Sequence, residues 1–326
     1  MMSEAVVSTR IRLARNLKEY PFPIRLTADK AREIVDQVGK ALQDSELKFH
    51  RIDMDAIPDT LRAAMIERHL VSPDFISEQE GRAVYLSDDN TVSIMVNEED
   101  HIRLQVILDD FRPEEAYALA DKIDNILSKK LNYAFHDRLG YLTQCPTNLG
   151  TGMRASVMLH LPALQMSGTV NRIGANLSKL GLTMRGLYGE SSKPAGAFFQ
   201  LSNQVTLGIS EKAAIENLKN ITNQLITQEM RARESLLNNI EAEDKIHRAL
   251  GVLKTAVLMD HNEAMRLLSL VRLGVSEKKL ETLSTDSIDK QIVEIQPASI
   301  MTRYGDDMGP RDRDIKRAEI LRERFN

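Results

Sequence analysis

Residues 83–108 read AVYLSDDNTVSIMVNEEDHIRLQVIL, and this stretch indicates the fold class. Two short runs rich in β-forming residues, Ala83–Ser87 and Thr91–Val96, are joined by Asp88-Asp89-Asn90, a composition typical of turns. A third run, Ile102–Leu108, follows the polar letters NEED. Short strands joined by short turns predict an antiparallel meander, whose third strand begins beside a cluster of acidic residues.

The surrounding sequence alternates between helical and strand patterns. Helices are predicted over residues 28–43 after Thr27 as N-cap, over 58–69, over 113–130 with Pro113 in the first turn, and over 162–180. Strands are predicted over Met153–Leu161, Leu182–Leu187 and Ala197–Ser202. Helices that accompany an antiparallel sheet place the chain in the α+β class and argue against a doubly wound parallel fold.

The pattern of helix and strand signals and the glycine content change once along the chain. Up to about Gly208 it mixes helix and strand signals with glycine-containing loops, whereas beyond Ser210 glycines are few and apolar residues recur at spacings of three and four. We therefore place a domain boundary near Arg233. The prediction is an antiparallel sheet flanked by helices over residues 1–233, followed by an all-helical domain over 234–326.

Composition and charge argue against several protein classes. The 326 residues carry 43 Lys and Arg against 47 Asp and Glu, a net charge of −4, so nothing indicates the basic surface that nucleic-acid binding needs. The single cysteine cannot form an internal disulfide. The N-terminus has no apolar signal core, and no apolar run is long enough to span a bilayer. We expect a cytoplasmic protein without membrane or direct nucleic-acid contact.

Five arginines stand out because they lie at the ends of predicted elements, beside glycine turns or carboxylates. They are Arg10, Arg12, Arg103, Arg154 and Arg185. The chain has neither of the two common glycine-rich phosphate loops, GxxxxGK[ST] and GxGxxG. Arginine binds phosphate oxygens through a planar fork of donors and keeps its charge, so a group of arginines can replace such a loop. The alternative is a set of ordinary surface arginines.

Carboxylates and one thiol form a second pattern. Glu98, Glu99 and Asp100 precede a strand, and Glu190 closes the stretch RGLYGE. Carboxylates that face phosphate-binding arginines suit a cationic second substrate such as a guanidinium, which they would hold and relieve of a proton. A thiolate at Cys145 would add a negative contact if nearby positive charge lowered its pKa. The alternatives are a solvated acidic loop and an inert buried thiol.

Four motifs in this order resemble those of the phosphagen (guanidino) kinases. They are STRIR at 8–12, NEEDHIR at 97–103, CPTNLGTG at 145–152 with Arg154, and Arg185-Gly186. The resemblance implies the guanidino kinase fold, phosphoryl transfer from ATP with Mg²⁺ to a guanidinium, and no metal ligands from the chain itself. It implies Glu99, Glu190 and Cys145 as the catalytic residues. The implied ATP contacts are Ser8, Thr9, Arg10, Ile11, Arg12, His69, Arg103, Arg154, Ala155, Ser156, Val157, Met158, Arg185, Gly186, Leu187, Tyr188, Gly189 and Glu190.

Two departures from the common family pattern narrow the implied activity. Only seven residues precede Ser8, where other members carry a helical domain, and a helical region continues from about 235 to 326. Both features are similar to those of bacterial members that phosphorylate arginine side chains in proteins. Arg313, Asp314 and Arg317 lie in RDIKRA, which resembles the phosphoarginine-binding motif of that branch. The letters SSKP at 191–194 depart from the glycine and acid expected after Glu190.

The resemblance also implies partners. They are protein substrates with accessible arginines, a zinc-binding activator protein, a heat-shock repressor controlled by the modification, a Clp ATPase that receives marked proteins for proteolysis, and a second copy of the chain in a homodimer. It further implies a stress-response role and allosteric control by phosphoarginine. Two other functions stay open on the residues alone: a kinase for free arginine and a non-catalytic reader of phosphoarginine.

Overall fold

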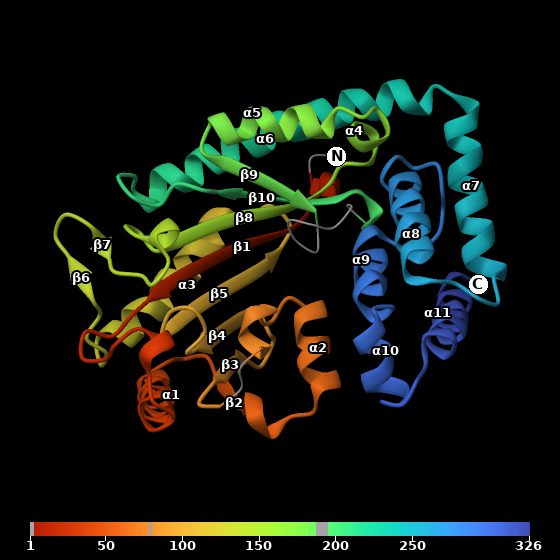
Figure 1. The fold of residues 1–326 in the computed structure, drawn as a ribbon. Helices are drawn as coiled ribbons and strands as arrows, with labels where there is room; N and C mark the ends of the chain where they lie inside the picture. Colours follow the sequence, from red (N-terminus) through yellow and green to blue (C-terminus); the bar gives the residue numbers. More distant parts are fainter. Residues whose placement is uncertain (1–2, 78–79, 187–194) are drawn as a thin grey trace. The chain divides into compact units, whose positions relative to one another are not determined.

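The computed structural model describes residues 3–77, 80–186 and 195–326, which group into two compact units (Figure 1). The sheet unit comprises residues 8–157 and 202–220. The helical unit comprises residues 1–7, 158–201 and 221–326. The predicted domain boundary near Arg233 stays a prediction.

The predicted meander forms the centre of the sheet unit. Strand β3 (Ala83–Ser87) pairs with β4 (Val92–Val96), and β4 pairs with β5 (Ile102–Asp109), both antiparallel. The other strands that contribute to this unit are β2 (Phe49–Asp53), β1 (Val6–Arg15), through its residues 8–15, and β8 (Met153–His160), through its residues 153–157. The strand order is β2-β3-β4-β5-β1-β8, which confirms the α+β prediction of an antiparallel sheet.

Three helices cover the two faces of this sheet. Helix α1 (Ala28–Leu42) begins at Thr27, whose hydroxyl accepts a hydrogen bond from the Lys30 amide as predicted for an N-cap. Helices α2 (Asp59–Glu67) and α3 (Pro113–Ser128) also lie where the sequence places them. Short elements complete the unit: η2 (Pro23–Arg25), η3 (Met54–Ala56), η4 (Asp74–Ile76), β6 (Phe135–His136), β7 (Gly140–Tyr141) and η5 (Pro146–Asn148).

The register of the strands assigns a different role to each face. Tyr85 pairs with Ile94, and its hydroxyl donates to the carbonyl of Val35, so this face is covered by α1. Val84 and Met95 point to the opposite face, where they pack in one cluster with residues of α2. Met95 also pairs with Arg103, which therefore lies on the α2 side of the sheet. Side chains on this second face form the candidate site.

The helical unit contains one correction to the sequence prediction. A single helix was expected over 162–180, but the chain forms α4 (Pro162–Met166) and α5 (Val170–Lys179). Gly168, between them, adopts the left-handed conformation with φ of 70°, which ends the first helix. Strand β10 (Phe198–Asn203) lies next to β9 (Leu182–Gly186). The other elements are η1 (Ser3–Ala5), η6 (Ala195–Ala197), α6 (Glu211–Leu237, which begins in the sheet unit), α7 (Ile240–Thr255), α8 (His261–Ser276), α9 (Thr285–Glu294), α10 (Pro297–Tyr304) and α11 (Pro310–Phe325).

A buried arginine links four segments of the helical unit. Arg272 of α8 forms two hydrogen bonds, of 2.7 and 2.9 Å, with the carboxylate of Asp289 on α9. It also donates to the carbonyl of Glu4 at 2.7 Å and lies 3.2 Å from Nδ1 of His160. Burial and the nearby Arg272 charge hold the pKa of His160 well below its usual value, so this histidine is neutral.

None of the described helices is both long and apolar enough to cross a membrane.

Candidate functional site

Two arginines of β1 and one of β5 share a face of the sheet. In the β1–β5 register Arg10 is opposite Ile107, Arg12 is opposite Gln105, and Ala14 is opposite Arg103. Because side chains two residues apart point to the same side of a strand, Arg10, Arg12 and Arg103 project together. The two-residue spacing of Arg10 and Arg12 in the sequence therefore places both on one face of β1.

The electrostatics of these arginines are those of an anion site. Burial and the charge of Arg103 lower the pKa of Arg10 to about 10. The pKa of Arg12 is held well below its usual value by burial and by the charges of Arg103, Arg10 and Arg154, so Arg154 belongs to the same cluster. The Nε of Arg12 is buried and has no hydrogen-bond partner among the described residues. An anion bound here would relieve the mutual repulsion and satisfy this donor.

The other residues of the STRIR motif divide between the two faces. Ser8 shares the face of Arg10 and Arg12, since it is two residues further along the strand. Ile11, on the opposite face, is fully buried in the core. Thr9 is also buried, and its hydroxyl donates to the carbonyl of Asp110 and accepts from the amide of Arg112. Thr9 therefore fixes the turn between β5 and α3.

His69 is anchored to the arginine face through its backbone. It follows α2 in a left-handed conformation with φ of 59°, and its carbonyl accepts a hydrogen bond of 2.8 Å from Gln105. Gln105 is the cross-strand neighbour of Arg12 and also donates to Ser93. Burial and the charge of Arg10 lower the pKa of His69 to about 3, so the ring is neutral at physiological pH.

The acidic turn between β4 and β5 holds three carboxylates in three different states. Glu98 is buried, and both of its oxygens lie 2.5 Å from Nη1 of Arg103; it also accepts from Ser72. Asp100 is buried and accepts from Asn16 and from the backbone of Gln144. Glu99, between them, is partly exposed and has no hydrogen-bond or ion-pair partner among the described residues. Of the three, Glu99 is the carboxylate available to a substrate.

The cysteine loop is shaped by glycines that side chains could not replace. Cys145 is partly exposed at the start of η5, and its sulfur lies 3.0 Å from the hydroxyl of Thr147. Gly150 has φ of 106°, and a Cβ there would collide with the carbonyl oxygen of Thr206. Gly152 has φ of 61°, and a Cβ would lie 2.6 Å from the carbonyl oxygen of Ala14. Glycine alone permits this close approach of the loop to β1.

The remaining predicted ATP contacts are distributed differently. Ala155, Ser156, Val157 and Met158 are buried in β8, and the Ala155 amide donates to the side chain of Asn203. Arg185 and Gly186 end β9 in the helical unit, with partial exposure. The predicted residues Leu187, Tyr188, Gly189 and Glu190 lie outside the described residues, as does the SSKP segment.

The predicted phosphoarginine-binding residues all lie on α11. Arg317 is 1% exposed, and it donates to the backbone carbonyls of Ile295 and Met259 and to Asp314 at 2.6 Å. Arg313 is partly exposed and donates to the carbonyl of Met308. The structure therefore brings the three side chains to one end of α11, with Arg317 already fully engaged in holding neighbouring segments together.

Polar residues that the sequence did not single out complete the site. Gln105 holds the His69 backbone, and Asn16 holds Asp100. Their partners are 36 and 84 residues away in the chain, so no local pattern marks them.

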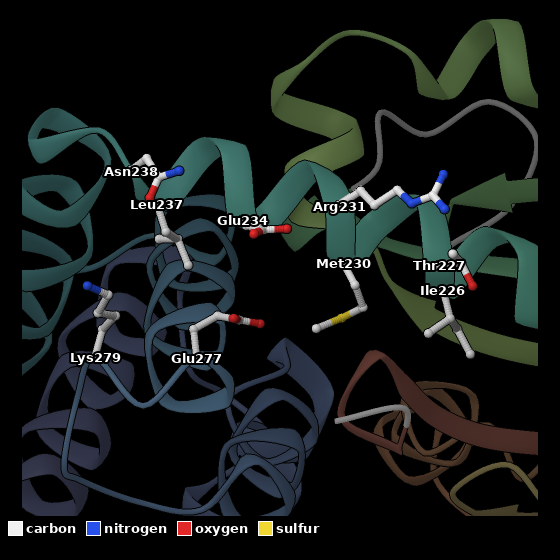
Figure 2. Close-up of a pocket in the computed structure, with 9 residues that line it drawn as sticks. All are labelled: Ile226, Thr227, Met230, Arg231, Glu234, Leu237, Asn238, Glu277 and Lys279. Atoms are coloured by element: carbon white, nitrogen blue, oxygen red, sulfur yellow. The ribbon is translucent and has the colours of Figure 1, made fainter.

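A separate pocket of about 580 Å³ lies in the helical unit, between α6 and the segment after α8 (Figure 2). Met230 and Leu237 contribute apolar surface, and the carboxylates of Glu234 and Glu277 point toward the same space. None of the predicted site residues that the structure describes lines this pocket. Within the described ranges, no group of three or more His, Cys, Asp or Glu side chains is placed to hold a metal ion.

Comparison with known families gives matches over most of the chain. Residues 30–232 match the ATP:guanido phosphotransferase C-terminal catalytic domain, and residues 239–326 match the protein-arginine kinase McsB C-terminal domain. A protein-arginine kinase of Halothermothrix orenii is 44% identical over 326 residues, which cover 99% of this chain and 93% of that protein. A protein-arginine kinase of Brevibacillus brevis is 46% identical over 330 residues, covering 99% and 92%.

Solved structures agree on the fold. A lombricine kinase superposes with a TM-score of 0.63 at 24% sequence identity, covering 70% of this chain and 66% of that one. The duplicated taurocyamine kinase of Schistosoma mansoni, in its substrate-free form, gives a TM-score of 0.63 at 23% identity, covering 94% of this chain and 41% of that one. These superpositions establish the predicted guanidino kinase fold.

Proposed function

Because the chain belongs to the protein-arginine kinases of the ATP:guanido phosphotransferase family, and is therefore a phosphotransferase acting on arginine, we propose that it transfers the γ-phosphoryl group of ATP to arginine side chains in proteins. The observation that carries this proposal is the arginine cluster on the α2 side of the sheet. Besides burial, the charge of Arg103 lowers the pKa of Arg10, and the charges of Arg103, Arg10 and Arg154 lower that of Arg12. One ion-paired carboxylate, Glu98, lies among these arginines. A polyphosphate supplies the negative charge that such a cluster lacks.

The acceptor side of the reaction rests on Glu99. A guanidinium nitrogen attacks the γ-phosphorus in line, a P–N bond forms as the bond from phosphorus to the bridging oxygen breaks, and ADP leaves. The guanidinium must lose one proton, and the carboxylate of Glu99, which has no partner among the described residues, is placed to orient it and accept that proton. Glu190 is proposed as a second carboxylate on the strength of the sequence motif alone, and Cys145 as a further contact to the acceptor.

The arginines and the carboxylate contribute different parts of the catalysis. The cluster binds and orients the phosphates, and it neutralises charge on the transferring group. Glu99 holds the acceptor in line with that group, so the reaction gains mainly from positioning. The described residues contain no group of three or more His, Cys, Asp or Glu side chains placed to hold a metal ion, and Mg²⁺ in phosphoryl-transfer sites is often held by one or two carboxylates and the substrate phosphates. We therefore propose that Mg²⁺ arrives with ATP, where it supplies charge neutralisation, and that the chain's contribution to phosphate binding comes from its arginines.

The wider biological role is also a proposal. The protein substrates would include a heat-shock repressor, and marked proteins would pass to a Clp ATPase. We also propose that the chain forms a homodimer, that a zinc-binding protein activates it, and that it acts in the cytoplasm during stress. Arg313, Asp314 and Arg317 are proposed to bind phosphoarginine and to make the enzyme responsive to its own product.

Phosphorus NMR of a protein substrate after incubation with ATP tests the proposed function. We expect an acid-labile P–N signal on an unfolded protein that contains arginine, and little turnover of free arginine. A P–N signal on free arginine alone would favour a phosphagen-type kinase. No ATP turnover with either acceptor would leave a non-catalytic phosphoarginine reader.

A further inference from the structure

We propose that Asn16 is a positioning residue for phosphoryl transfer, because its side chain joins the turn that carries Glu99 to the loop that carries Cys145. We call this arrangement the Asn16 clasp; it comprises Asn16, the acidic turn 97–101 and the loop segment 142–145. The inference rests on the proposed function, since it assigns Asn16 a part in placing the acceptor.

The clasp is a set of buried hydrogen bonds from one amide side chain. Nδ2 of Asn16 donates to Oδ1 of Asp100 at 2.6 Å and to the carbonyl of Leu142 at 3.0 Å. Oδ1 of Asn16 accepts from the amide of His101 at 2.9 Å. Asp100 Oδ1 then accepts from the amide of Gln144 at 2.8 Å, which closes the connection between turn and loop. Asn16 and Asp100 are each only 2% exposed.

His101 reinforces the same junction. Its Nδ1 accepts from the amide of Leu17 at 2.9 Å, so its Nε2 carries the proton and donates to the carbonyl of Pro21 at 2.8 Å. Burial lowers the pKa of His101, which keeps this neutral tautomer. Residues 16–17 are therefore fixed to residues 100–101 by three hydrogen bonds, and the acidic turn cannot shift without breaking them.

The positions of Glu99 and Cys145 explain how Asn16 can affect the reaction. Glu99 directly precedes Asp100, and Cys145 directly follows Gln144. Glu99 and Cys145, the two proposed contacts to the acceptor, are therefore each one residue away from the hydrogen bond between the Gln144 amide and Asp100. Because a misplacement of about 1 Å can cost roughly a hundredfold in rate, loosening this junction should reduce turnover without touching a substrate contact.

The charge environment explains why an amide, and not an acid, occupies position 16. Burial raises the pKa of Asp100, and the neighbouring Glu99 and Glu98 charges raise it further. The hydrogen bonds from Asn16 and Gln144 act in the opposite direction and favour the carboxylate. A second carboxylate 2.6 Å away would compete for a proton instead of donating one.

Asn16→Asp tests the clasp through its pH dependence. At pH 8 the two carboxylates repel, and we expect kcat to fall about tenfold or more with KM for ATP nearly unchanged. Toward pH 6 a proton shared by the pair restores a donor, so kcat relative to the parent enzyme should rise. Asp100→Asn should keep most of its activity, because an amide oxygen accepts the same two hydrogen bonds. Asn132→Asp changes an exposed amide 2.6 Å from Glu19 and is the matched control. Its kcat relative to the parent enzyme should not change between pH 8 and pH 6.

The single cysteine provides a readout that does not depend on the reaction. We expect the alkylation rate of Cys145 to rise several-fold in Asn16→Ala, since the loop loses the hydrogen bond from Asn16 to the Leu142 carbonyl and Asp100 loses the donor that holds it toward the loop. Asn132→Asp should alkylate like the parent. An activity ratio for Asn16→Asp that does not change with pH, or an unchanged kcat in Asn16→Ala, would overturn the proposal. Failure of the proposed function would look different: the parent enzyme would form no P–N bond on a protein acceptor, whatever the alkylation rates.

Discussion

Nη1 of Arg103 lies 2.5 Å from both carboxylate oxygens of Glu98, and the next residue, Glu99, has no hydrogen-bond or ion-pair partner among the described residues. The pair places one neutralised arginine at the border between the cationic cluster and the acidic turn. On one side Arg10 and Arg12 keep charges that repel each other. On the other side, within the part of the chain that the structure describes, the carboxylate of Glu99 is not engaged and can contact a cation. A negatively charged phosphoryl donor and a positively charged phosphoryl acceptor would therefore meet at the Arg103–Glu98 pair.

Arg12→Ala should weaken ATP binding more than it affects the acceptor. Arg12 has a buried Nε without a partner among the described residues, and a hydrogen bond between charged groups contributes about 1.5–3 kcal/mol. We expect the dissociation constant for ATP, measured by calorimetry, to rise roughly 10- to 100-fold. Arg248→Ala, which removes a largely exposed arginine paired with Asp244, is the control. Equal effects of the two substitutions would refute a phosphate contact at Arg12.

Glu99→Gln should lower kcat strongly while leaving ATP affinity close to that of the parent. The substitution keeps the size of the side chain but removes the charge that orients a guanidinium and the base that takes its proton. A loss of about 100-fold or more in kcat is expected, measured as ADP release with a protein acceptor. Glu281→Gln changes an exposed glutamate and serves as control. Normal turnover in Glu99→Gln would remove this residue from the mechanism.

Cys145→Ser should leave reduced but measurable activity. The sulfur lies 3.0 Å from the hydroxyl of Thr147, and a serine hydroxyl can keep that hydrogen bond. If the thiol only adjusts the acceptor pocket, the reaction proceeds without it, and mass spectrometry of the parent enzyme during turnover should find no phosphate on Cys145. A trapped phosphocysteine would show a covalent role instead.

Acidification should destabilise the protein in part through His69. The pKa of His69 is lowered from its ordinary value of 6.5 to about 3 in the folded state. Between these values the unfolded chain binds a proton that the folded chain does not, so the free energy of unfolding decreases as pH falls. His69→Asn tolerates the left-handed backbone and cannot titrate. Urea denaturation at pH 7.5 and 5.5 should therefore show a smaller loss for the variant; an equal loss in both proteins would contradict the assignment.

The parts of the fold that the sequence predicts are those with local causes. The meander is bounded by turn residues, and Thr27 caps α1, so both follow from short windows. The helix predicted over 162–180 is wrong because the periodic apolar pattern continues across Gly168, whose left-handed backbone ends α4. Strand β2 was not predicted: its letters FHRID alternate poorly, and most of its side chains are exposed or half-exposed.

In the candidate site, too, the residues that the sequence predicts are those marked by local motifs. The arginines and acids were predicted because motifs bring them together in the sequence. Asn16 was not, because it contacts Asp100 and Leu142, which are 84 and 126 residues away. The fold alone makes these contacts, and a sequence without its structure carries no sign of them.

Arg317 and Arg313 should respond differently to substitution, although both belong to the proposed phosphoarginine-binding motif. Arg317 is buried and donates to the carbonyls of Ile295 and Met259, so Arg317→Ala leaves two carbonyls without a donor. At about 1–3 kcal/mol for each buried group left unpaired, we expect a clear loss of stability as well as of binding. Arg317→Ala alone therefore cannot separate recognition from folding.

Arg313→Ala makes that separation. Its side chain is partly exposed and donates to a single carbonyl, that of Met308, so the melting temperature should change little. The lost guanidinium would nevertheless remove a bidentate partner for the phosphoryl oxygens. Calorimetry with free phosphoarginine should then show binding to the parent and none to Arg313→Ala, while ATP turnover without phosphoarginine is retained. Arg311→Ala changes an exposed arginine two residues away on the same helix, and this variant should bind like the parent. Undiminished binding by Arg313→Ala would make α11 an ordinary charged helix whose arginines serve the fold.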